Sequence, residues 1–268
     1  MEQNNKKIYN PNDYLAPNKL VAILFYILLM FVIGIFITYL VAYIYSSIHN
    51  VPYGEIKASY TLKGEEFENL SFDILKANAI SRGYGNLIVY ALLTFIVGFF
   101  TRDELKKDLF KFKDEKKRKL YYWFIPVTAI AFTAINFGLD KLISMGVSVS
   151  ENQAQIENIF KNGGMAPMLV TTILFAPLVE EIIFRKCIFS LCGEKRIALA
   201  YVISVVSFTL IHMMTTSAPF GEWALMCIPY FVSGIMLAAI YHLSGFNVYV
   251  STIAHICNNI LAIILVFI

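Results

Sequence analysis

The chain has 268 residues, of which 58% are hydrophobic and only 15% carry a charge. Soluble domains have about 25% charged residues, and a mean hydropathy of +0.63 is too high for a soluble globular protein. This composition predicts an all-α, polytopic transmembrane helix bundle, with the lipid bilayer as its surroundings and no nucleic acid as a partner. The net charge of +3 adds little, because in a membrane protein the position of each charge matters more than the sum.

Long apolar runs predict about seven transmembrane helices, with eight as an alternative. A helix needs about 20 apolar residues to cross a bilayer, and the first run is longer than that and carries no charge. It lacks the short core and the small-residue cleavage site of a signal peptide, so we expect this span to be retained. The expected spans cover about residues 20–45, 85–100, 120–139, 166–192, 197–214, 223–241 and 248–268.

The second of these spans is short for a membrane helix. An extension backwards through residues 77–80 would lengthen it, but the charge of Arg82 argues against that extension and leaves a re-entrant segment open. The segments between spans are expected to be loops. Residues 46–85 and 140–165 would lie outside the cell, and residues 101–119 would form a solvated amphipathic linker inside it.

Basic residues predict which side of the membrane each loop occupies. With the polar amino-terminal tail (residues 1–19) inside, the inner segments hold 16 lysines and arginines and the outer segments hold 6. Cytoplasmic loops are richer in these residues, so we expect a cytoplasmic amino terminus. Lysine outnumbers arginine 17 to 5, a coding bias that favours a bacterial cell membrane. We divide the chain into residues 1–164, with the tail and three variable spans, and residues 165–268, a catalytic-type helical core.

Ionisable residues at membrane depth are rare, because each is unfavourable by at least roughly 2.5 to 3.5 kcal/mol on insertion scales. Glu180, Glu181 and Arg185 occupy the fourth span, His212 the fifth and His255 the seventh. With a rise of about 1.5 Å per residue, the three helices bring these side chains to similar depths. A shared site is therefore geometrically feasible.

The spacing within the fourth span predicts different roles for its two glutamates. Glu181 and Arg185 are four residues apart on one helix face, so we expect them to neutralise each other. Consecutive helical residues point about 100° apart, so Glu180 is free to face a cavity and accept a proton from water. Pro177 lacks an amide and predicts a loosened turn just before the pair. Gly193 is expected to end the helix.

Each of these features also has a purely structural interpretation. Two glutamates can form an ion cluster that holds helices together, and a single His212 is more often a hydrogen-bonded core residue than a catalyst. His255 and Asn259 are four apart on one face, where they can bind a developing oxyanion or bridge two helices. The coincidence of three polar sets at one depth favours the functional interpretation.

Three short motifs lie in these late spans: EExxxR at residues 180–185, FxxxH at 208–212 and HxxxN at 255–259. In order and spacing they resemble the CAAX prenyl protease and bacteriocin-processing family, also called the Abi family of intramembrane proteases. The resemblance covers roughly residues 165–262. The first three spans resemble the family only in being hydrophobic.

The resemblance implies a mainly helical intramembrane endopeptidase with a small set of functional residues. Glu180 would activate the attacking water, and Asn259 would help to stabilise the oxyanion. The catalytic residues that it implies are Glu180, Glu181, His212, His255 and Asn259. The orienting residues that it implies are Arg185, Phe184 and Phe208.

Metal dependence stays open at this stage. Glu180, His212 and His255 could supply the three ligands of an open catalytic zinc site, and the family is often labelled metalloprotease. The chain has no HExxH motif on one helix, and a metal-free mechanism uses the same residues. Zinc is therefore one of two alternatives.

The expected substrate is a membrane-associated peptide or protein. Eukaryotic relatives remove the last three residues of prenylated CAAX proteins, whereas bacterial members are associated with processing of quorum-sensing and bacteriocin precursors and with self-immunity. The coding bias favours the bacterial role. Two other classes also fit intramembrane polar residues. One is a proton-coupled transporter, against which the lack of internal repeats counts, and the other is a non-catalytic membrane partner or regulator.

Overall fold

The computed structural model describes residues 17–144 and 150–267, and within these ranges it is helical with no strand. This confirms the all-α fold class. Residues 1–16 of the predicted cytosolic tail lie outside the described part of the chain. The helices are α1 (Pro17–Leu28), α2 (Gly34–His49), α3 (Tyr53–Ser59), α4 (Glu65–Glu68), α5 (Phe72–Phe100), α6 (Arg102–Lys113), α7 (Glu115–Ser144), α8 (Glu151–Lys161), α9 (Met165–Val170), α10 (Ala176–Glu180), α11 (Ile188–Cys192), α12 (Ile197–Met213), α13 (Phe220–Leu243) and α14 (Val248–Phe267).

Seven segments of the described chain are long and apolar enough to cross a bilayer, which confirms the predicted number of spans. Large apolar side chains on them face outwards, where Leu24 is 65%, Phe36 68% and Trp123 77% exposed. Such side chains suit hydrocarbon, and helices satisfy most of their backbone groups internally. The chain is therefore an integral multi-pass membrane protein. The segments are Pro17–His49, Phe72–Phe100, Leu120–Leu139, Met165–Cys192, Glu194–Met213, Phe220–Leu243 and Val248–Leu265.

The second span is longer than the sequence predicts, because α5 runs unbroken through Arg82. The guanidinium of Arg82 lies 4.8 Å from the ring centre of Tyr60 and donates to the Tyr60 carbonyl oxygen. It also donates to the side-chain oxygens of Asn78 and Gln155. Burial raises the pKa of the Tyr60 phenol, so the ring is neutral at pH 7 and presents its face to the cation. The prediction that Arg82 opposes this helix was wrong, since the charge has partners from distant segments.

Three predicted loops contain helices. The outer segment 46–85 includes α3, α4 and the first turns of α5, and the outer segment 140–165 includes α8. The inner segment 101–119 consists largely of α6 and the first turn of α7. Most of its described side chains are exposed or half-buried, as expected of a solvated amphipathic linker, but its Asp108 is completely buried.

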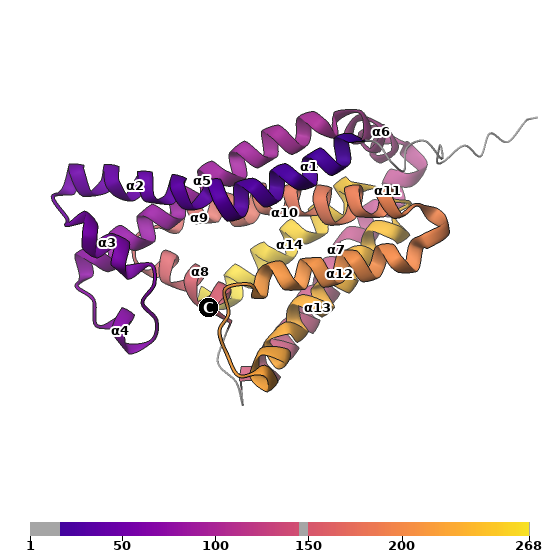
Figure 1. Cartoon of the computed structure of the whole chain (residues 1–268). Helices are drawn as coiled ribbons and strands as arrows, with labels where there is room; N and C mark the ends of the chain where they lie inside the picture. Colours follow the sequence, from indigo (N-terminus) through magenta and orange to yellow (C-terminus); the bar gives the residue numbers. More distant parts are fainter. Residues whose placement is uncertain (1–16, 145–149, 268) are drawn as a thin grey trace, which may run out of the picture.

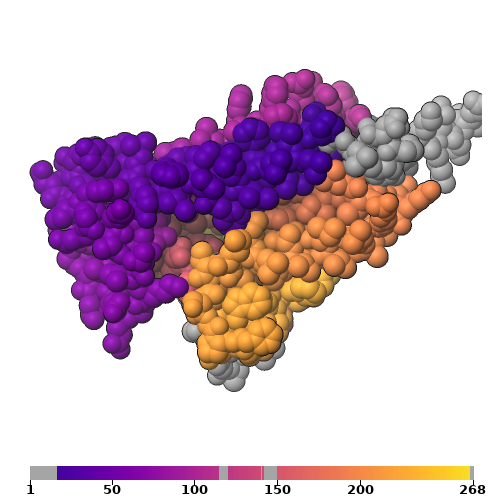
Figure 2. All heavy atoms as spheres, in the orientation of Figure 1, coloured from indigo at the N-terminus to yellow at the C-terminus, as the bar shows by residue number. Residues whose placement is uncertain are grey.

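The segment Met165–Cys192 lies at the centre of the bundle. It contains α9, α10, α11 and two π-helical turns, and 56% of its apolar stretch is buried, the largest share among the seven spans. Figure 1 shows α1, α2 and α5 on one side of this segment and α12 and α13 on the other, with α14 packed alongside. Figure 2 shows the surface hollowed between the indigo and the orange helices. The central segment is thus enclosed by both halves of the chain.

A buried salt bridge attaches the linker of residues 101–119 to this central segment. Lys186 Nζ donates to both carboxylate oxygens of Asp108, at 2.9 and 2.8 Å. The same carboxylate accepts the backbone amide of Val248 at 3.2 Å, which satisfies one of the free amides at the start of α14. The side-chain amide of Asn247 donates to the Asp108 carbonyl oxygen at 2.9 Å. Asp108 therefore joins α6 to two of the helices that carry motifs.

Asp108→Asn is expected to destabilise the protein, because Lys186 would lose the carboxylate that compensates its buried charge. Removing one partner of a buried ion pair costs about 3 to 5 kcal/mol. The measurement is the unfolding temperature of purified protein in detergent, which should fall. Asp103→Asn, on an exposed part of the same helix, is the control and should leave that temperature unchanged. Equal temperatures for the two variants would contradict this account.

Candidate active site

The helix that carries the two glutamates is not a regular α-helix. π-helical turns occupy Thr171–Phe175 and Glu181–Cys187, and α10 lies between them. Pro177 interrupts the hydrogen-bond ladder because it has no amide, and the π turn directly before α10 confirms the predicted loosening. Gly193, with a φ of 75°, ends the segment at the predicted position. π turns often occur at functional sites.

Glu181 is completely buried and has two partners. Its Oε2 lies 3.5 Å from Arg185 Nε, and its Oε1 lies 3.2 Å from His255 Nδ1. The predicted pairing of Glu181 with Arg185 is therefore confirmed. Both side chains are 0% exposed, so water does not compete for the pair and the attraction is stronger than it would be at a surface.

Aromatic rings surround the guanidinium of Arg185. Its central carbon lies 4.8 Å from the ring centre of Phe208 and 5.9 Å from that of Phe184. In the described part of the chain its three nitrogens have no hydrogen-bond partner, although Nε is within ion-pair range of Glu181. The faces of the two rings therefore supply the remaining compensation for the charge. Both phenylalanines predicted to orient the site contact Arg185.

In each motif histidine, one ring nitrogen contacts an oxygen acceptor. His255 Nδ1 faces the Glu181 carboxylate, and His212 Nδ1 lies 2.8 Å from the Phe208 carbonyl oxygen. A carboxylate or carbonyl oxygen only accepts, so Nδ1 carries the proton in each contact, and Nε2 contacts neither of these two oxygens. Both rings also pack near the ring of Phe208, with centroids 4.5 Å away for His212 and 6.3 Å for His255. Phe208 thus links the two histidines.

Glu180 has a different environment from its neighbour. It is 5% exposed, and the Tyr90 hydroxyl of α5 donates to its Oε1 at 3.3 Å. Among the described residues it forms no salt bridge within 4.0 Å and no hydrogen bond to His212 or His255. The structure therefore groups Glu181, and not Glu180, directly with a motif histidine.

Asn259 contacts the π turn Thr171–Phe175. Its Nδ2 donates to the carbonyl oxygen of Thr172 at 2.9 Å, and its Oδ1 accepts from Asn258 at 3.3 Å. Asn258 in turn accepts from the Thr133 hydroxyl at 3.2 Å. A side-chain amide has two N–H groups, so Asn259 keeps one donor for a further acceptor.

The possible zinc ligands do not form a metal-binding group in this structure. Glu180, His212 and His255 are described residues, and no group of three or more His, Cys, Asp or Glu side chains in the described ranges could hold a metal ion. The arrangement thus does not fit a catalytic zinc, which needs three protein ligands on one ion.

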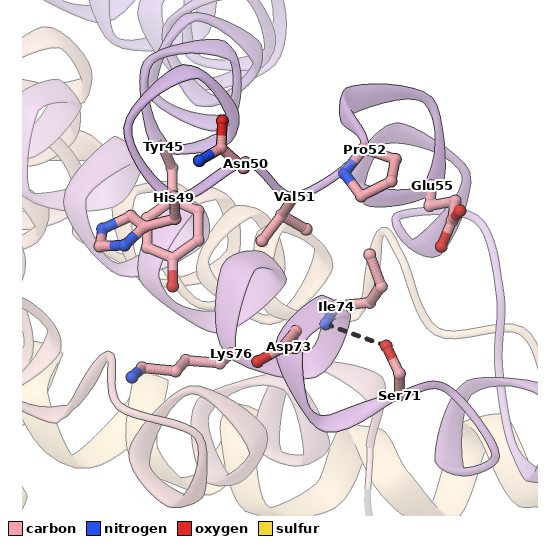
Figure 3. Close-up of a pocket in the computed structure, with 10 residues that line it drawn as sticks. All are labelled: Tyr45, His49, Asn50, Val51, Pro52, Glu55, Ser71, Asp73, Ile74 and Lys76. Atoms are coloured by element: carbon pink, nitrogen blue, oxygen red, sulfur yellow. Dashed lines mark hydrogen bonds between the residues drawn. The ribbon is translucent and has the colours of Figure 1, made fainter.

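The polar pocket in Figure 3 is separate from the motifs. It has a volume of about 300 Å³ and lies where α2 ends, near α3 and the start of α5. Its charged lining residues include Glu55, Asp73 and Lys76, and no motif residue lines it. The chemistry of the candidate site therefore depends on the contacts of the buried motif residues and not on this pocket.

Two contacts of the site come from residues that the sequence does not single out. Tyr90 is one of 16 tyrosines, and nothing in its apolar surroundings marks it as a partner of Glu180. Asp108 is one of several acids in a mixed-charge linker. Its only signal was Lys186, an intramembrane cation that needs an anionic partner.

Comparison with known proteins places the motifs in one family. Residues 162–261 match the family model described as type II CAAX prenyl endopeptidase Rce1-like. The chain is also 25% identical over 205 residues to a protein of Mycoplasma capricolum subsp. capricolum that is named only as an uncharacterized protein. That alignment covers 70% of this chain and 57% of the relative, so the chain matches little more than half of the relative's length. No solved structure matches this chain.

The family match contains all three motifs and begins just before the central segment of the bundle. The seven apolar helices agree with a membrane-embedded member. Residues 162–261 therefore match an Rce1-like domain, which supports the resemblance of the three motifs to the CAAX prenyl protease and bacteriocin-processing family.

Proposed function

We propose that this protein is an intramembrane endopeptidase of the CAAX type, which hydrolyses a peptide bond in a membrane-associated peptide or protein. The observation that supports this proposal is the different environment of two adjacent glutamates. Glu181 is paired with Arg185 and faces His255, whereas Glu180 has a neutral phenol as its partner. Two adjacent glutamates with such different partners provide one carboxylate that is held in an ion pair and one that can accept and release a proton.

In the proposed reaction Glu180 is the general base. Water gives a proton to the Glu180 carboxylate as its oxygen bonds to the peptide carbonyl carbon, and the carbonyl π electrons move onto the carbonyl oxygen. The second N–H of Asn259 is the donor assigned to this oxyanion. When the oxyanion collapses and the C–N bond breaks, Glu180 returns the proton to the leaving amine. The products are a carboxylic acid and an amine.

The remaining motif residues are proposed to orient these groups. His212 and His255 each offer Nε2 as an acceptor, which can hold the second hydrogen of the attacking water. Glu181 and Arg185 fix the position of His255 and of the helix that carries Glu180. Phe184 and Phe208 hold Arg185 between them.

The proposed biological role is bacterial peptide processing, of a quorum-sensing or bacteriocin precursor, or self-immunity to a bacteriocin. The matched relative comes from a mycoplasma, which is a bacterium, and the lysine-rich composition is consistent with this. We propose that the amino terminus is cytoplasmic, because the segments on that side hold most of the basic residues.

Glu180→Gln is expected to lower the rate of peptide cleavage by about 10²- to 10⁴-fold, the usual contribution of a general base. Glutamine keeps the shape of the side chain and still accepts from Tyr90, but it takes no proton from water. The measurement is cleavage by purified protein in detergent of a prenylated CAAX peptide and of a panel of bacterial precursor peptides. Glu222→Gln, at an exposed position, is the matched control and should cut like wild type.

A Glu180→Gln variant that cuts at the wild-type rate would exclude the proposed mechanism. A cellular phenotype that survives in this variant would point to a non-catalytic membrane partner. Proton-linked substrate flux in proteoliposomes, without cleavage, would point to a transporter.

A strong chelator is expected to leave the cleavage rate unchanged, because the three candidate zinc ligands do not form a metal-binding group in the described residues. The rate is measured before and after treatment, and again after zinc is added back. Loss of activity that zinc restores would contradict the metal-free mechanism but not the peptidase function.

Arg185→Met is expected to lower the unfolding temperature in detergent, because Glu181 would remain buried without its cation. The cost of breaking a buried pair is about 3 to 5 kcal/mol. Arg196→Met, at an exposed position in the turn before α12, should not lower it, and neither should Glu180→Gln. If Arg185→Met unfolds at the wild-type temperature, the ion pair does not hold the site together.

A further inference from the structure

We propose that Tyr26 and Tyr90, from the first two spans, complete the active site by holding the attacking water against Glu180. This inference rests on the proposed peptidase function. Tyr26 lies in α1 and Tyr90 in α5, and both precede residue 162, where the family match begins. The part of the chain before the family match would thus contribute residues to the proposed reaction.

Tyr90 is the residue in direct contact with the proposed base. Its hydroxyl donates to Glu180 Oε1 at 3.3 Å. A donor on one carboxylate oxygen restrains the side chain and leaves Oε2 to take the proton from water. The contact follows from the packing of α5 against α10. Tyr90 is thus a positioning residue, since it acts through Glu180.

Tyr26 supplies the second phenol. It is 1% exposed, and its hydroxyl oxygen is buried without a partner in hydrogen-bonding geometry among the described residues. The hydroxyl lies close to the Tyr90 hydroxyl, in a contact that falls short of a well-formed hydrogen bond, and it interacts electrostatically with Glu180. Buried hydroxyls almost always bond to protein or to ordered water. A buried hydroxyl whose contact with Tyr90 is incomplete, beside the carboxylate of the proposed base, can bind a small polar ligand such as water.

The position of Tyr26 is fixed by a motif residue. Its ring meets the ring of Phe184 edge to face, with the centroids 5.8 Å apart. Phe184 belongs to the EExxxR motif and also contacts Arg185. α1 packs against the π turn Glu181–Cys187, so Tyr26 lies on a helix that contacts the turn beginning directly after Glu180.

A buried water typically bonds about three polar groups, and here the Tyr26 hydroxyl and the Glu180 carboxylate supply two of them, while Tyr90 restrains the carboxylate. A water held there accepts from the Tyr26 hydroxyl and directs one hydrogen to Glu180. Its free lone pair then points away from these groups, towards the substrate. This arrangement prepares the water for attack before a substrate arrives.

The test compares Tyr26→Phe, Tyr90→Phe and the double variant in the peptide cleavage assay. Each single variant should lower kcat by about 10- to 100-fold, the range expected when one hydrogen bond to a charged or reacting group is lost. KM should stay unchanged, because neither phenol contacts the peptide. The double variant should fall no further than the more damaged single variant, since both phenols serve one water: Tyr26 binds it and Tyr90 restrains the carboxylate that takes its proton.

Tyr121→Phe is the matched control. It also removes a buried phenol hydrogen bond, to the Ser244 carbonyl oxygen at 2.9 Å, but it lies in a different hydrophobic cluster of the bundle. Its kcat should equal that of wild type. Unfolding temperatures are measured for all variants, because a purely structural role would lower stability without lowering kcat below the transition.

The outcomes separate this inference from the proposed function. If Glu180→Gln is inactive while both tyrosine variants keep the wild-type kcat, the water site is wrong and the peptidase proposal stands. Multiplying effects in the double variant would also overturn a shared water. If Glu180→Gln itself is fully active, the proposed function fails.

Discussion

The buried charge of Glu181 is the constraint on which the site depends. A carboxylate without compensation inside a bundle is strongly unfavourable, and here it is met by Arg185 from the same helix and His255 from α14. Arg185 in turn requires the ring of Phe208 from α12. One charge therefore brings together the three helices that carry the motifs, and it does so without using Glu180.

Arg185 and Lys186 are neighbours in sequence, yet their partners lie in different parts of the molecule. The carboxylate partner of Arg185 lies in its own helical segment, whereas that of Lys186 is Asp108, in the linker of residues 101–119. Because Asp108 also binds the first amide of α14, the linker is a structural part of the core. A buried ion pair therefore crosses the predicted boundary at residue 164. The segments on the two sides of this boundary depend on each other for charge compensation.

The sequence was informative where the responsible interactions are local. Apolar runs predicted seven spans, four-residue spacing predicted the Glu181 and Arg185 pair, and Pro177 predicted a loosened turn. It was uninformative where the partner is distant. Tyr90 and Glu180 are 90 residues apart along the chain, and such a contact leaves no periodic pattern in the residues around either of them. The start of α5 was missed for the same reason, because the groups that compensate Arg82 come from other segments.

The π turn at Thr171–Phe175 also shows how one added or removed residue changes the direction of a side chain in a membrane helix. Its hydrogen bonds run from residue i to i+5 rather than to i+4, so the turn accommodates one residue more than a regular helix would. Each residue turns a helix by about 100°. A single-residue insertion in an ordinary membrane helix is therefore enough to rotate an acid by more than a quarter turn relative to the segment before it. By the same reasoning, a single-residue deletion here would turn Glu180 away from its present direction, while the segment would stay long and apolar enough to cross the bilayer.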